Sequence, residues 1–122
     1  MNFRGISFFL GLYSLLISFF SFLNILYSIY FNLNFNSYAI LLIISFIIGF
    51  SFCFVGRKNI KNISLFEQII FILVGFIFLP LLISLPFFLN TNITFLNSYF
   101  EAISGFTATG FSIIKNVNNI DE

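Results

Sequence analysis

The chain of 122 residues is 60% hydrophobic and only 7% charged, and its mean hydropathy is +1.10. Four acidic and five basic side chains are too few to cover the surface of a soluble domain of this length, so lipid is the expected solvent. A net charge of +1 argues against nucleic-acid binding, and one cysteine without any histidine excludes a disulfide framework and the usual zinc sites.

Two long uncharged runs predict the first two transmembrane helices. Residues 8–31 exceed the ~20 residues that a helix needs to cross a bilayer. Their length and the lack of a small-residue cleavage site distinguish them from a signal peptide. Residues 38–56 form the second run and contain the only cysteine, Cys53, which we expect to be a packing or lipid-facing thiol.

A third uncharged run, residues 69–89, follows a polar start. Ser64 and Glu67 have the S-x-x-E spacing of a capping box, so this helix is expected to begin near Leu65 and Glu67 is expected to be a cap. Pro80 and Pro86 lie within it; proline kinks are common in membrane helices, and we assign them no chemistry.

The distribution of basic residues predicts the orientation. Lys and Arg in short loops stay on the cytoplasmic side of a membrane. The bases cluster before the first helix and between the second and third, at Arg4, Arg57, Lys58 and Lys61. We therefore expect a multi-pass protein of the inner (plasma) membrane with a cytoplasmic amino terminus, and residues 90–94 on the external face.

Residues 95–105 are too short to span the membrane but have the pattern of a helix. One apolar face, at the spacing i, i+3, i+4 and i+7, is formed by Leu96, Tyr99, Phe100 and Ile103. Gly105 is expected to end this helix. The small and hydroxyl-rich residues 106–111 follow, which suggests a segment that re-enters the membrane.

Residues 99–110 read Y-F-E-A-I-S-G-F-T-A-T-G. This string resembles the first pore loop of the Trk/Ktr/HKT potassium uptake family, whose pattern is F-E-A-x-S-G-x-T-T-T-G. The L-P-F sequence at residues 85–87 is similar to the outer end of that family's first pore-region helix, and the two preceding spans match its extra amino-terminal pair. Ala108 replaces the usual threonine. Because the backbone carbonyl is retained, we expect Ala108→Thr to have only a mild effect on potassium uptake and selectivity.

The resemblance implies an all-α membrane protein in which three transmembrane helices precede a re-entrant pore helix and a selectivity-filter strip. Residues 1–64 would form the amino-terminal helix pair with its cytoplasmic link, and residues 65–122 the first pore-region helix, pore helix and filter. The implied function is potassium transport rather than enzymatic catalysis, with potassium as transported substrate and no cofactor. A filter of this kind is narrow and extended and binds the ion through backbone carbonyls. These would belong to Thr107, Ala108, Thr109 and Gly110.

Gly110 and Glu101 are the two residues of the motif for which the sequence predicts a specific role. Gly110 permits a backbone conformation that is unfavourable for other residues, and a larger residue would place a side chain in the ion path. Glu101 has two interpretations: it concentrates cations at the external mouth, or it forms a capping box with Ser98.

The family builds its pore from four repeats, and this sequence contains less than one of them, so we expect it to be the amino-terminal portion of a longer protein. The resemblance implies the remaining pore repeats, a homodimeric partner and a cytoplasmic nucleotide-binding regulatory subunit as partners. One strip offers oxygens from one side only, so these residues alone are expected to insert without supporting uptake. A small non-transporting membrane protein that packs against partner helices is the alternative; a membrane-bound enzyme lacks histidine and paired carboxylates.

Overall fold

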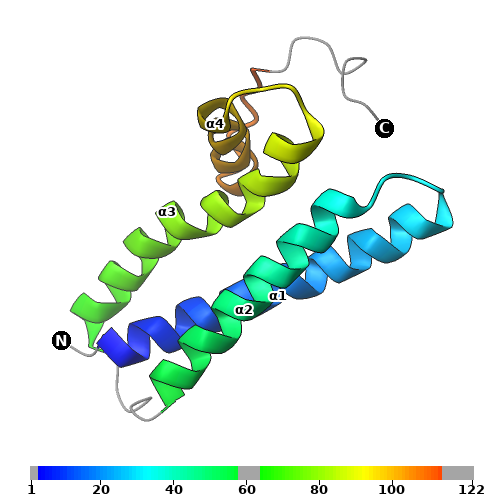
Figure 1. Cartoon of the computed structure of the whole chain (residues 1–122). Helices are drawn as coiled ribbons and strands as arrows, with labels where there is room; N and C mark the ends of the chain where they lie inside the picture. Colours follow the sequence, from blue (N-terminus) through cyan, green and yellow to red (C-terminus); the bar gives the residue numbers. More distant parts are fainter. Residues whose placement is uncertain (1–2, 58–63, 114–122) are drawn as a thin grey trace.

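The computed structural model describes residues 3–57 and 64–113, and this part of the chain is all α-helical (Figure 1). It contains four helices: α1 (Phe3–Tyr30), α2 (Asn36–Gly56), α3 (Leu65–Asn90) and α4 (Phe95–Phe106). The first three are long and apolar enough to cross a membrane, so the three predicted spans are confirmed as candidate membrane-spanning helices, as in a multi-pass membrane protein.

The predicted start of α3 is confirmed. The hydroxyl of Ser64 accepts a hydrogen bond of 3.3 Å from the backbone N–H of Glu67. The carboxylate of Glu67 accepts one of 3.0 Å from the backbone N–H of Ser64. This reciprocal capping box satisfies two amides that the first turn of a helix cannot pair. Pro80 and Pro86 both lie inside the helix.

Helices α1 and α2 form a closely packed hairpin whose contact surface is built from small residues. The buried small residues of α1 are Gly5, Gly11, Ser14, Ser18, Ser21 and Ser28, and those of α2 are Ser37, Ser45, Gly49 and Gly56. A Cβ added at Gly11 would lie 2.8 Å from the carbonyl oxygen of Gly49. In lipid, apolar side chains gain little by leaving their solvent, so close backbone approach and interhelical hydrogen bonds hold such a pair together.

Hydrogen bonds from serine reinforce this hairpin. The hydroxyl of Ser14 donates to the carbonyl oxygen of Ser45 at 2.8 Å, and both side chains are fully buried. Cys53 lies at the same interface, with its Sγ 3.8 Å from the carbonyl oxygen of Phe8. Of the two expected environments for this thiol, packing or lipid-facing, the structure shows packing against α1.

The two ends of the three long helices are distinct. A Cβ added at Gly56 would lie 2.5 Å from the carbonyl oxygen of Arg4, so the start of α1 and the end of α2 meet at one end. At the other end the hydroxyl of Ser37 donates to the side-chain oxygen of Asn90. Arg4 and Arg57 thus lie at the same end; Lys58 and Lys61 lie outside the described residues.

Helix α4 folds back along α3 (Figure 1). Its first residue, Phe95, packs edge-on against Phe88 near the end of α3, with ring centroids 5.8 Å apart. Its last residue, Phe106, packs against Phe76 at 5.5 Å, well back along α3. Among the described helices, α4 contacts α3 and neither α1 nor α2. The prediction that Gly105 ends this helix is wrong by one residue, because the helix continues through Phe106.

Candidate functional site

The first turn of α4 is set by Thr94. Its hydroxyl caps the helix by accepting a hydrogen bond of 3.4 Å from the backbone N–H of Asn97. Ser98 lies inside the helix, fully buried, and its hydroxyl donates to the carbonyl of Thr94 at 3.1 Å. The capping-box interpretation of Ser98 and Glu101 is therefore wrong, because the helix begins earlier and both residues are past its amino-terminal cap.

The last turn of α4 ends in a Schellman motif. The N–H of Thr109 donates to the carbonyl of Ser104 at 3.0 Å, and the N–H of Ala108 donates to the carbonyl of Gly105 at 3.2 Å. Ala108 has φ of 55°, the left-handed conformation that this motif usually assigns to glycine. An extended strip was predicted, and this prediction is wrong at Ala108, where the backbone has a left-handed conformation.

The two threonine hydroxyls turn back onto the helix. Thr107 Oγ1 donates to the carbonyl of Ile103 at 2.8 Å, and Thr109 Oγ1 lies 3.3 Å from both the carbonyl and the hydroxyl oxygen of Ser104. The two threonine oxygens are themselves 3.2 Å apart. Both hydroxyls are thus engaged beside the end of α4, and the backbone carbonyls are the oxygens that the strip presents.

The residues that carry these carbonyls are exposed. All four residues from Thr107 to Gly110 are solvent-accessible, and within residues 3–57 and 64–113 no hydrogen bond is made to their carbonyl oxygens. Gly110 has φ of 73°, the type of conformation that was predicted for it. A Cβ added there meets nothing within 4 Å, so in this chain the backbone conformation, rather than crowding, favours glycine.

Glu101 connects the middle of α4 to the segment that follows the strip. Its Oε1 accepts a hydrogen bond of 2.9 Å from the hydroxyl of Ser112 and one of 2.5 Å from the backbone N–H of Ile113. This contact could not be predicted from local sequence patterns, because a separation of eleven or twelve residues across a loop has no helical periodicity.

The chemistry available at this loop is that of oxygen acceptors. The carboxyl end of a helix carries a partial negative charge, and α4 ends where the strip begins. No group of three or more His, Cys, Asp or Glu side chains that could hold a metal ion occurs in the described ranges. The oxygens that the loop itself offers to a cation are backbone carbonyls, the type of ligand found in potassium-selective filters.

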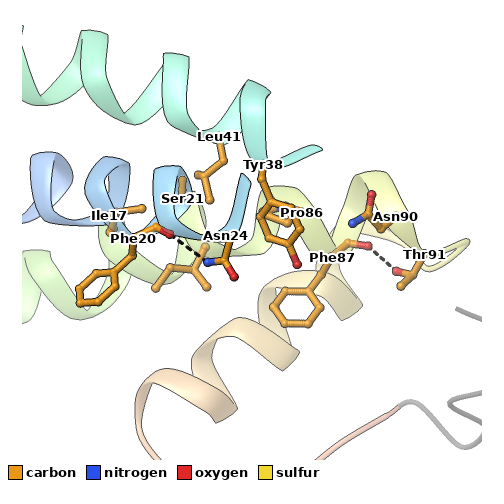
Figure 2. A pocket seen from close by; sticks show the side chains of 11 residues that line it. Ile17, Phe20, Ser21, Asn24, Tyr38, Leu41, Pro86, Phe87, Asn90 and Thr91 are labelled. Carbon is orange, nitrogen blue, oxygen red and sulfur yellow. Dashed lines mark hydrogen bonds between the residues drawn. The ribbon is translucent and has the colours of Figure 1, made fainter. Parts of the chain in front are cut away.

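A cavity of about 380 Å³ lies between α1, α2 and α3 near the end where Ser37 meets Asn90 (Figure 2). Its lining side chains are mainly apolar and include a few amide and hydroxyl groups. The amide of Asn24 is engaged, since it donates to the carbonyl of Phe20 at 3.0 Å. The hydroxyls of Ser21, Tyr38 and Thr91 belong to its lining, which includes no carboxylate, histidine or cysteine.

No protein-family model, no curated protein and no solved structure matches this chain. The assignment of the loop after α4 therefore depends on its own residues and geometry.

Proposed function

We propose that this chain takes part in transmembrane potassium transport, as the amino-terminal portion of a Trk-type uptake protein. The observation that carries the proposal is the loop at the carboxyl end of α4. It presents four exposed residues, from Thr107 to Gly110, whose carbonyls accept no hydrogen bond in the described part of the chain.

The position of α4 supports a re-entrant arrangement. A helix of 12 residues is about 18 Å long, less than the ~30 Å of a hydrocarbon core. Because α4 starts at the end of α3 and returns along it to Phe76, a membrane that α3 spans would enclose the end of α4 and the strip. Irregular backbone at that depth is tolerated only where it is buried in protein or lines a water-filled cavity.

The chemistry of the loop suits a weakly hydrated monovalent cation. Carbonyl dipoles replace the hydration shell of such an ion without binding it too tightly to leave. The carboxyl end of α4 adds a favourable partial charge. A single strip supplies oxygens from one side only, so in this proposal the remaining pore repeats surround the ion. A homodimeric partner and a cytoplasmic nucleotide-binding regulatory subunit follow from the family resemblance.

The proposal also assigns the orientation. Arg4 and Arg57 lie at one end of the helices, and α4 with its loop begins at the other. With the basic end cytoplasmic, the loop enters from the external side of the plasma membrane.

The test compares two glycines of the same segment. Gly110 and Gly105 both have open space around an added Cβ, but only Gly110 has a positive φ. We expect Gly110→Ser to impair potassium uptake or to let sodium compete, and Gly105→Ser to leave both unchanged. The measurement is uptake by a potassium-uptake-deficient bacterium that expresses the complete reading frame containing these residues, or the chain joined to the remaining Trk-type pore repeats.

Membrane insertion of each variant is confirmed separately. If Gly110→Ser retains wild-type uptake and selectivity, the filter assignment is abandoned, and a membrane protein that only packs against partner helices becomes the better description.

A further inference from the structure

We infer that Glu101 is a positioning residue that closes the segment from α4 to Ile113 into a fixed loop and so sets the place of the carbonyl strip. The structural part of the inference concerns contacts within this chain. Its consequence for ion transport rests on the proposed function.

The strip is held at both of its ends. At its start, the Schellman motif fixes Ala108 and Thr109 to the last turn of α4. At its far end, Ser112 and Ile113 are held by the carboxylate of Glu101, which lies more than one turn back in the same helix. The intervening residues are exposed, and a Cβ added at Gly110 would touch nothing. Among the described residues, the Glu101 contact is therefore what restrains the strip beyond the Schellman motif.

The chemistry of the contact favours an anionic acceptor. Both donors reach one oxygen, Oε1, and hydrogen bonds to a carboxylate are shorter and roughly twice as strong as neutral ones. A glutamine has an Oε1 in the same place but no charge. Glu101→Gln therefore retains the acceptor, whereas Glu101→Ala removes it.

This difference separates positioning from an electrostatic role at the external mouth. A residue that acts by attracting cations loses its effect equally in the glutamine and alanine variants. A residue that acts by holding the loop is largely rescued by glutamine.

The direct test is amide hydrogen exchange of Ile113 in the chain reconstituted in lipid nanodiscs. We expect Glu101→Ala to lower the protection of the Ile113 amide about tenfold, and Glu101→Gln to keep it within about threefold of the unmodified chain. Ser112→Ala is expected to leave the Ile113 amide mostly protected, because its own hydrogen bond remains. The amide of Ser98, bonded to the carbonyl of Thr94 at 3.0 Å, reports whether α4 stays folded.

Equal protection of Ile113 in the unmodified chain and Glu101→Ala, with Ser98 protected in both, would overturn the inference. The inference is also overturned if the Ile113 amide loses as much protection in Glu101→Gln as in Glu101→Ala. In the uptake assay, loss of potassium selectivity in Glu101→Ala with rescue by Glu101→Gln is the expected result. The proposed function fails separately, if Gly110→Ser leaves uptake unchanged, and that outcome does not alter the exchange of Ile113.

Discussion

The hydroxyl of Tyr99 on α4 donates a hydrogen bond of 3.0 Å to the backbone carbonyl of Ile77 on α3. This carbonyl lies next to that of Phe76, the group to which residue 80 would donate in a regular helix. Pro80 has no N–H, and its ring disturbs the turn before it. The bond therefore holds α4 to α3 one residue away from the carbonyl that the proline leaves without its helical donor.

Tyr99→Phe should therefore loosen α4 from α3 while keeping the aromatic ring. We expect a loss of about 1 kcal/mol in the free energy of unfolding, the typical net value of one hydrogen bond. The measurement is unfolding in detergent, with Tyr30→Phe as control, since Tyr30 is 80% exposed. Equal stability of Tyr99→Phe and the unmodified chain, with Tyr30→Phe also unchanged, would show that this bond does not hold α4 to α3.

The packing of the three long helices predicts opposite effects for two glycines, Gly11 on α1 and Gly75 on α3. An alanine Cβ at Gly11 would lie 2.7 Å from the backbone nitrogen of Cys53, so the helices must move apart. The nearest atom to a Cβ at Gly75 is a side-chain carbon of Leu10 at 3.9 Å, an ordinary contact. We expect Gly11→Ala to destabilise by about 1–3 kcal/mol and Gly75→Ala to stabilise by about 0.5 kcal/mol. Thermal unfolding in the same detergent compares the two, and similar shifts would contradict the close approach.

The spans and the Ser64–Glu67 cap could be predicted because each depends on local sequence: an uncharged run of sufficient length, and a spacing that a single turn satisfies. The small-residue contact surface of α1 also has a sequence pattern, because Gly11, Ser14 and Ser18 are three and four positions apart. It was missed because the apolar residues around it dominate the composition.

The candidate site was predictable in part. Its location after a short helix and the positive φ of Gly110 followed from the motif. The contact between Glu101 and Ile113 did not, because it depends on where the chain turns after the helix. Ser98 and Glu101 have the spacing of a cap, but Thr94 occupies that position in the structure, which spacing alone could not decide.

Ala108 has a left-handed conformation, so its substitutions should follow backbone strain. An L-residue with φ of 55° costs roughly 1–2 kcal/mol relative to a right-handed conformation, and glycine avoids most of this cost. We expect Ala108→Gly to stabilise the loop by about 0.5–1 kcal/mol. Ala108→Thr should destabilise it by about 1 kcal/mol, because β-branched residues are rarely found there.

Hydrogen exchange of the Thr109 amide, which closes the Schellman motif by bonding to Ser104, measures these effects. Protection should rise in Ala108→Gly and fall in Ala108→Thr. The reverse order would show that the motif is not maintained in the membrane.

The orientation gives the last prediction. A cysteine at Asn92, in a Cys53→Ser background, should react with an impermeant thiol reagent applied to intact cells. Asn92 is exposed in the link between α3 and α4, at the end opposite Arg4 and Arg57. A cysteine at Asn59, which lies outside the described residues but between Arg57 and Lys61 in sequence, should react only after the cells are opened. The Cys53→Ser chain without a new cysteine sets the background. Labelling of Asn59→Cys but not Asn92→Cys on intact cells would invert the orientation and place the carbonyl strip on the cytoplasmic side, where it could not serve as an external filter.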